Sequence, residues 1–243
     1  VFGLWMKGAS APWNDVKVRR AVSLAIDRDD IIAAEAGGAV HQGFLPLAVG
    51  GENAWPAEKT KATFKADLAQ AKKLLAETGF TTNATPFVLK TSQGYSNDVE
   101  VVQKQLEALG MNVKIDLAPG TAVSPVLAKK DFDLAFGPWS GGRLPDFWLG
   151  EVVRGGGNRN ITGYADSKLD GMIATQIKEV DTKKRKVLLD QIQDYLVENM
   201  PYVPTITRIY YHFEACRVRN IRNPHNSWST WGASEAWLDP QGC

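Results

Sequence analysis

The sequence predicts an α/β fold with a mixed central sheet flanked by helices. Short apolar segments of strand character occur at residues 2–6, 86–90, 113–117 and 132–136. The stretches between them have the apolar spacing of helices, and strands separated by helices form a sheet that helices cover. Hydrophobic residues make up 44% and charged residues 23% of the chain, as in ordinary globular proteins.

Two helices are predicted near the start of the chain. Asp15 can cap the first helix, and Asp27 can cap a second one over residues 28–36. Arg19 and Arg28 belong to these helices. We interpret them as surface charges in ion pairs, which contribute little to stability.

The middle of the chain alternates loop and helix. Residues 41–56 are rich in Gly and Pro and lack periodicity, so they predict a long loop. Asp67 and Asn97 each begin a capping-box pattern, which predicts a helix after each of them. Gly79 and Gly110 are the expected ends of these two helices.

Residues 140–160 again predict a loop, and the glycine triplet at 155–157 is interpreted as a flexible turn. Asp166 and Asp181 are the expected caps of two further helices, the second of which ends before Pro201. The tail that follows is first rich in β-forming residues and then polar and aromatic. This change in composition near Cys216 predicts that the tail leaves the domain.

Charge and motifs exclude several classes of function. The net charge is +1 and basic residues are interspersed with acids, so nucleic acid is not an expected partner. The histidines lack zinc-ligand spacing, and the sequence contains neither a nucleophile elbow nor a phosphate-binding loop. We therefore expect no catalytic residues, no metal and no cofactor. Cys216 and Cys243 fit either one disulfide or two free thiols.

Five segments carry short motifs in a fixed order. They are PWNDVKVRRA with AIDR at residues 12–28, AKKLLAETGF at 71–80, DFDL with Trp139 and Pro145-Asp146 at 131–146, Asn160 with Gly163-Tyr164 and Asp170, and Gln191-Ile192 with Pro201 and Val203-Pro204. Together they resemble the C-terminal lobe of the family 5 extracellular solute-binding proteins of ABC transporters. The resemblance covers about residues 1–210.

The resemblance implies a division of the chain into two parts. Residues 1–208 are expected to form the ligand-binding C-terminal lobe of a periplasmic-binding-protein fold. Residues 209–243 are expected to be a return segment that packs on an N-terminal lobe of the same protein, which this sequence lacks. The abrupt apolar start without a visible signal peptide also suggests a piece cut from a longer protein.

Trp139 and Tyr95 are candidate ligand-binding residues because each follows a predicted strand, where open α/β sheets place ligands. The indole of Trp139 is expected to wall the ligand. The alternatives are a core tryptophan at a strand end for Trp139 and ordinary loop packing for Tyr95.

Three further candidates lie just beyond Trp139. The resemblance implies that peptide-binding relatives have an Asp three residues after this Trp, where it pairs with the ligand's α-ammonium. This sequence has Gly142 there, which argues against ordinary peptides as the ligand. Arg143 suits a carboxylate or a sugar, or is a solvated loop charge. Asp146 matches the family only with a shift of one residue, and capping of the loop is the favoured role.

The resulting hypothesis is a solute-binding component of an ABC importer that captures a peptide-like, opine-like or oligosaccharide solute. Its expected partners are the membrane permease and the missing lobe. The expected location is periplasmic or extracellular, with a possible lipid anchor on the full-length protein. The alternative is a small-molecule hydrolase or transferase of α/β type, which needs a nucleophile–base pair near Trp139.

Overall fold

The centre of the chain is a five-stranded mixed sheet in the order β4-β3-β5-β1-β6. In this computed structural model, residues 2–35, 38–119, 127–139, 144–209, 215–220 and 236–241 are described. The strands are β1 (Phe2–Met6), β3 (Phe87–Ser92), β4 (Val113–Ala118), β5 (Leu134–Pro138) and β6 (Val203–Pro204). β3 runs parallel to β4 and β5, whereas β1 is antiparallel to β5 and β6. The predicted mixed sheet is confirmed.

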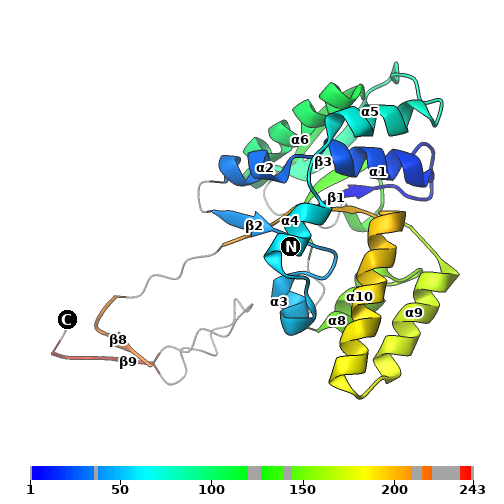
Figure 1. Cartoon of the computed structure of the whole chain (residues 1–243). Helices are drawn as coiled ribbons and strands as arrows, with labels where there is room; N and C mark the ends of the chain where they lie inside the picture. The colour runs from blue at the N-terminus through cyan, green and yellow to red at the C-terminus, as the bar shows by residue number, and fades with distance from the viewer. Residues whose placement is uncertain are drawn as a thin grey trace. The chain divides into compact units, whose positions relative to one another are not determined.

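The chain divides into two compact units, Val1–Arg208 and Ile209–Cys243. In the first, Figure 1 shows one group of helices gathered in the upper part of the view and a pair of helices side by side below. The upper group is α1 (Val16–Ala25), α2 (Arg28–Ala34), α5 (Leu68–Ala76) and α6 (Ser96–Leu109). The lower pair is α9 (Ser167–Lys178) and α10 (Thr182–Asn199). The predicted helices on the sheet are therefore present.

Carboxylate caps start most of these helices. Asp15 accepts the backbone N–H of Lys17, and Asp27 accepts that of Asp29. Asp67 accepts the N–H of Gln70 at the start of α5. Asp166 and Asp181 do the same for α9 and α10. These predicted caps are confirmed.

The cap predicted at Asn97 is wrong. α6 begins one residue earlier, and its N-cap position, Tyr95, makes no side-chain cap bond. The cause is the 3₁₀ turn η2 (Gln93–Tyr95), which runs directly into the helix. It leaves no residue in the extended conformation from which a side chain could cap the first N–H groups of α6.

The prediction of surface ion pairs is wrong for Arg19, which is only 4% exposed. Its guanidinium donates to the carbonyl of Trp13 at 2.8 Å, and to those of Asn199 and Met200 at 2.7 and 3.0 Å. These acceptors lie at the start of α1 and at the end of α10. Arg19 therefore ties the two helices together through backbone oxygens that burial would otherwise leave unsatisfied.

Arg28 is also buried, at 1% exposed. It donates to the carbonyls of Pro204, Phe64 and Ile26 at 2.9, 2.9 and 3.0 Å. The guanidinium also lies 4.8 Å from the centroid of the Phe64 ring. The donors join α2 to β6 and to the end of α4 (Ala57–Thr63), three segments far apart in the sequence.

Residues 41–56 are not one long loop. The segment contains the end of β2 (Ala39–His41), the short helix α3 (Leu47–Gly50) and the turn η1 (Gly51–Asn53). β2 pairs antiparallel with β7 (Ile206–Arg208). Phe44 and Leu45 are buried in the core, and this packing orders a segment that has no periodicity of its own.

The loop predicted at 140–160 is also more ordered than its composition suggests. It contains α8 (Pro145–Phe147) and η3 (Trp148–Val153), which is a π-helix. Trp148 is fully buried and donates its indole N–H to the carbonyl of Phe44 at 2.9 Å. Burial of this side chain gives the segment the apolar contacts that regular structure needs.

The glycine triplet is not a flexible turn throughout. A Cβ at Gly157 would lie 2.4 Å from the carbonyl oxygen of Glu151 and 2.8 Å from that of Gly150. Only glycine permits this close approach of the loop backbone to η3. Gly156 adopts φ 72°, the left-handed region that glycine favours.

The second unit is described at Ile209 and at residues 215–220 and 236–241. Its strands β8 (Val218–Arg219) and β9 (Trp237–Leu238) pair antiparallel. Arg219 and Asp239 form an ion pair of 3.2 Å beside them. Cys216 is disulfide-bonded, which favours the first of the two cysteine alternatives. The roles predicted for the two units, binding lobe and return segment, stay predictions.

Candidate solute-binding edge

One edge of the sheet collects strand ends from several parts of the chain. β3, β4 and β5 are parallel, so their carboxyl ends lie at the same edge. β1 is antiparallel to β5, and Phe2 pairs with Pro138, so the start of β1 lies there too. Open α/β sheets bind ligands outside the carboxyl ends of their strands. We call this region the carboxyl edge.

Trp139 leaves β5 at the carboxyl edge and is partly buried. Its indole N–H donates to the carbonyl of Arg159 at 2.9 Å. The ring lies 6.4 Å from that of Trp5, in an edge-to-face arrangement. Because its only donor is used by the protein, Trp139 can offer a solute its apolar ring surface.

Tyr95 lies at the same edge, at the end of the turn that follows β3. Its ring meets the Phe2 ring edge-on, with centroids 5.1 Å apart. The guanidinium of Arg208 lies 4.7 Å from the Tyr95 centroid and 4.6 Å from that of Phe2. Tyr95 is therefore held by a cation and an aromatic partner, and is positioned by more than loop packing.

Arg208 is itself held by two carboxylates. Its Nη2 lies 2.6 Å from Oδ2 of Asp98, and its Nε donates to Oε1 of Glu35. The side chain of Glu35 is 9% exposed and that of Asp98 is 2% exposed. Burial and the neighbouring Asp98 raise the pKa of Glu35 to about 7. We call Glu35, Asp98, Arg208, Phe2 and Tyr95 the Arg208 cluster.

Sequence reasoning found Tyr95 but missed the other four members of this cluster. Glu35 and Arg208 are 173 residues apart, and Asp98 and Arg208 are 110 apart. No local motif joins residues at such separations. Pairing of β2 with β7 brings Arg208 to Glu35, since Arg208 lies opposite Ala39, close to the end of α2. Packing of α6 against α2 adds Asp98.

Gly142 and Arg143 lie outside the described residues, so their predicted roles stay predictions. Asp146, on α8, is described. Its Oδ1 accepts Nε2 of Gln176 at 2.9 Å and pairs with the guanidinium of Arg185. These bonds tie α8 to α9 and α10, an arrangement that fits the favoured structural role of Asp146.

The loop next to Trp139 is organised by Asn160, which is 3% exposed. Its Nδ2 donates to the carbonyls of Arg154 and Tyr164 at 3.0 and 2.8 Å. Its Oδ1 accepts the Thr162 hydroxyl and the N–H of Gly163. One side chain thus closes the loop that carries the acceptor of the Trp139 indole. Sequence reasoning recognised Asn160 only as part of a motif.

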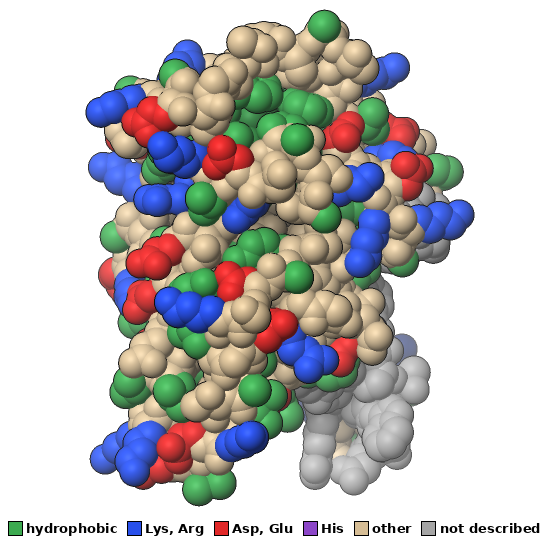
Figure 2. Space-filling view, turned by 90° about the vertical axis from the view of Figure 1, so that its right-hand side faces the viewer, with side chains coloured by type: hydrophobic (Ala, Val, Ile, Leu, Met, Phe, Trp, Pro, Cys, Tyr) green, Lys and Arg blue, Asp and Glu red, His purple; other side chains and the backbone are tan. Residues whose placement is uncertain are grey.

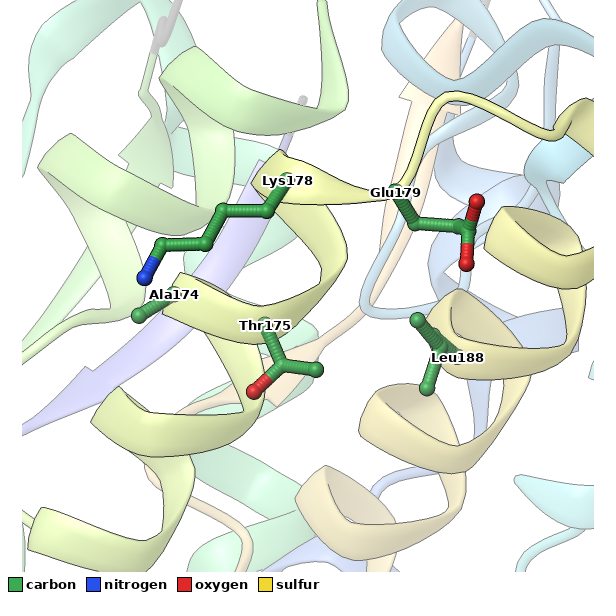
Figure 3. Close-up of a pocket in the computed structure, with 5 residues that line it drawn as sticks. All are labelled: Ala174, Thr175, Lys178, Glu179 and Leu188. Carbon is green, nitrogen blue, oxygen red and sulfur yellow. The ribbon is translucent and has the colours of Figure 1, made fainter.

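A shallow groove lies elsewhere, between α9 and α10. It has a volume of about 320 Å³ and is lined by Ala174, Thr175, Lys178, Glu179 and Leu188. Figure 3 shows Thr175 and Leu188 on opposite helices, pointing toward the space between them. Neither Trp139 nor Tyr95 lines this groove, so it is separate from the predicted site.

Charge gives no separate candidate site on the face shown in Figure 2, where Lys and Arg alternate with Asp and Glu. In the described part of the chain, no three acidic, histidine or cysteine side chains gather in a way that could hold a metal ion. The described helices also include none with the length and apolarity needed to cross a membrane.

The mixed central sheet flanked by helices defines a fold of the periplasmic-binding-protein type. The sequence profile described as "Bacterial extracellular solute-binding proteins, family 5 Middle" matches residues 1–160. The chain belongs to this family, as the five motifs predicted. The family and the curated relatives are solute-binding proteins, which favours the prediction of a binding protein over a hydrolase or transferase.

Curated relatives include the oligopeptide-binding protein AppA of Bacillus subtilis, 27% identical over 219 residues, which are 82% of this chain and 39% of the relative. The periplasmic oligopeptide-binding protein OppA of Salmonella typhimurium is 27% identical over 216 residues, covering 86% of this chain and 39% of the relative. The chain thus spans about two fifths of the length of these relatives.

Solved structures show the same fold. The substrate-binding protein CtaP of Listeria monocytogenes aligns with a TM-score of 0.74 and 21% identity, over 85% of this chain and 43% of that one. AgaA of A. tumefaciens R10, solved with agropinic acid, aligns with a TM-score of 0.72 and 23% identity, over 85% of this chain and 43% of that one. A mannohexaose-bound protein of Thermotoga maritima gives a TM-score of 0.73 and 18% identity, over 84% and 43%.

Proposed function

We propose that this chain is the C-terminal lobe of the solute-binding component of an ABC importer. The observation that carries the proposal is the family match, together with an aromatic carboxyl edge at the end of β5. The match covers 39% of the relative, which leaves room for a second lobe that closes over the solute. The protein acts outside the cytoplasmic membrane and hands its solute to a permease. A lipid anchor on the full-length protein belongs to the same proposal.

In this proposal Trp139 and Tyr95 form apolar walls for the solute, and Gly142 and Arg143 line the space beyond Trp139. Asp146 acts by holding α8 in place. Arg143 provides a cation for a carboxylate or a hydrogen-bond donor for a sugar. No carboxylate stands at residue 142 to pair with the α-ammonium of a peptide. An opine-like or oligosaccharide solute therefore fits better than an ordinary peptide.

These solute classes also occur among structural neighbours, since AgaA was solved with agropinic acid and the Thermotoga protein with mannohexaose. A peptide-like solute remains an alternative because the curated relatives include oligopeptide-binding proteins. The three classes differ in charge and in ring content, so they can be separated by direct binding measurements.

The test is thermal unfolding of the full-length protein with dipeptides, opines and oligosaccharides. A ligand at 100 times its Kd stabilises the native state by about 2.7 kcal/mol, which raises the unfolding midpoint measurably. We expect one class to do so. The proposal fails if no class raises the midpoint and the protein instead turns over a chromogenic ester or phosphate.

Trp139→Ala in the full-length protein identifies the site. Loss of the aromatic wall should weaken binding of the stabilising solute about 10- to 100-fold in isothermal titration, given the cost of truncating a buried aromatic at an interface. Ile177→Ala, which trims an exposed side chain on the outer face of α9, is the control and should bind normally. Equal affinities of the two variants would place the solute elsewhere.

A further inference from the structure

In the first unit, the Arg208 cluster joins β1, which contains Phe2, to the end of β7. Arg208 is the last residue before the chain passes into the second unit. The Arg208 guanidinium contacts the Phe2 ring at 4.6 Å and binds carboxylates from α6 and from the end of α2. One cation on β7 therefore connects β1, α6 and the end of α2 at the point where the chain leaves the unit.

The charges in this cluster do not balance. Glu35 and Asp98 are two carboxylates, and among the described residues Arg208 is the one cation that binds both of them. Both carboxylates are at least nine-tenths buried, so water screens their mutual repulsion poorly. Two carboxylates that share a buried site relieve this repulsion by sharing one proton.

The two aromatic members of the cluster stabilise the Arg208 cation but do not balance the charge of the carboxylates. The rings of Phe2 and Tyr95 both lie within 5 Å of the guanidinium carbon of Arg208. They cover it with apolar surface and stabilise the positive charge without adding a negative one. Among the described residues, the excess negative charge is thus left to be neutralised by a proton.

We propose that Glu35, Asp98 and Arg208 form a proton-linked tie, in which one proton on the carboxylate pair completes the network that holds the chain where it leaves the unit. The tie also fixes Tyr95, so proton binding is linked to the shape of the carboxyl edge. The inference does not depend on solute binding and is tested on the chain without a solute.

The groups that face Glu35 from neighbouring elements are known among the described residues. Asp98 faces it from α6 and Arg208 from β7, while Tyr95 contacts Arg208 from η2. The other acids of α2 are engaged at its opposite end. Asp29 pairs there with His41 and Lys61, and Asp30 accepts the side chain of Gln105.

The sign of the effect follows from the raised pKa of Glu35. The folded protein holds the proton up to a pH of about 7, whereas the ordinary value for a glutamate is 4.5. Stability from this group is fully present below the ordinary value and is lost as the pH rises through about 7. The tie is therefore strongest under mildly acidic conditions.

The first experiment measures the thermal midpoint of the 243-residue chain from pH 5 to pH 8. Glu35→Gln keeps the shape of the neutral acid but cannot ionise. We therefore expect this variant to lose the part of the pH-dependent decrease in thermal midpoint that comes from the proton-linked tie. Glu100→Gln, which changes an exposed carboxylate on α6, is the matched control and should keep the wild-type profile. A profile for Glu35→Gln that matches the wild type would overturn the proposal.

The second experiment needs no folded variant at position 35. Carboxyl ¹³C NMR of the wild-type chain should show a glutamate that titrates one pH unit or more above the ordinary value of 4.5. Asp98→Asn should move that midpoint down toward the ordinary value, because it removes the neighbouring negative charge. The proposal is wrong if no glutamate of the wild-type chain titrates one pH unit or more above the ordinary value, or if Asp98→Asn leaves the raised midpoint where it is.

Discussion

Arginine serves here mainly as an internal donor to backbone carbonyls and carboxylates. Arg19, Arg28 and Arg208 each connect segments that are far apart in the sequence. The planar guanidinium has five N–H groups, so one side chain can satisfy several buried oxygens at once. Lysine at these positions would lack the geometry to do the same.

Arg28→Leu should destabilise the chain by about 3–5 kcal/mol, since it leaves the buried carbonyls of Pro204, Phe64 and Ile26 without donors. Urea unfolding followed by circular dichroism measures the loss. Arg20→Leu changes an exposed arginine of α1 and should stay within about 0.5 kcal/mol of the wild type. A similar small effect at Arg28 would show that its hydrogen bonds contribute little.

Gly142→Asp tests the proposed reason for excluding ordinary peptides. In the full-length protein the new carboxylate should increase affinity for dipeptides by about tenfold or more, because a charge-assisted bond to an ammonium contributes about 1.5–3 kcal/mol. Isothermal titration with a dipeptide gives the change. Gly171→Asp places the same charge on α9 and should leave dipeptide affinity as it was; an equal gain in both variants would point to a general charge effect.

At the scale of elements, close packing and shared acceptors hold the helices. The backbone of the glycine loop packs closely against carbonyl oxygens of the π-helix η3. Asp166 caps α9 and also accepts the hydroxyls of Tyr164 at 3.0 Å and of Tyr195, on α10, at 2.8 Å. These contacts help to fix the position of the α9–α10 pair in the unit.

Gly157→Ala should destabilise the chain by about 1–3 kcal/mol, because the added methyl group collides with two carbonyl oxygens of η3. Gly171→Ala, in the middle of α9, meets no atom within 4 Å and should instead stabilise it by about 0.5–1 kcal/mol. Chemical unfolding of both variants compares the two. Similar effects of the same sign would contradict the close approach at Gly157.

Asp166→Asn should weaken the stability of the chain near neutral pH and flatten its decline in acid. Partial burial acts to raise the pKa of Asp166, but hydrogen bonds from the Leu169 N–H and from the two tyrosine hydroxyls lower it overall. Stability from this group is present above the ordinary value of 3.8 and is lost as the pH falls through the lower folded value. Thermal midpoints of both proteins between pH 2 and 7 measure it. An unchanged acid profile would show that Asp166 is not linked to unfolding.

At the scale of the whole molecule, we propose that the chain carries one side of a binding site. It spans about two fifths of the length of its curated relatives. A site that closes between two lobes needs contacts from both of them for high affinity. The 243-residue chain should therefore bind the solute of the full-length protein at least about 100-fold more weakly, a loss of about 2.7 kcal/mol. Micromolar binding by the isolated chain in isothermal titration would contradict a two-lobed site.

The family, the mixed sheet and most helix starts could be predicted from the sequence alone. Helix caps and strand alternation are local, because a carboxylate reaches only the next turn and a strand shows its pattern over five or six residues. The five motifs kept their order along the chain, which was enough to indicate the family. Of the candidate site, Trp139 and Tyr95 were predicted at the edge where the structure places them.

Only the tertiary structure decided which charged groups are buried and which distant residues meet. Arg19 and Arg28 resemble surface charges when read along a helix, yet both satisfy carbonyls of other segments. Glu35, Asp98 and Arg208 meet because β2 pairs with β7 and α6 packs against α2, contacts that no local pattern encodes. The physical reason is that caps and turns depend on neighbours in sequence, whereas burial, and with it the raised pKa of Glu35, depends on neighbours in space.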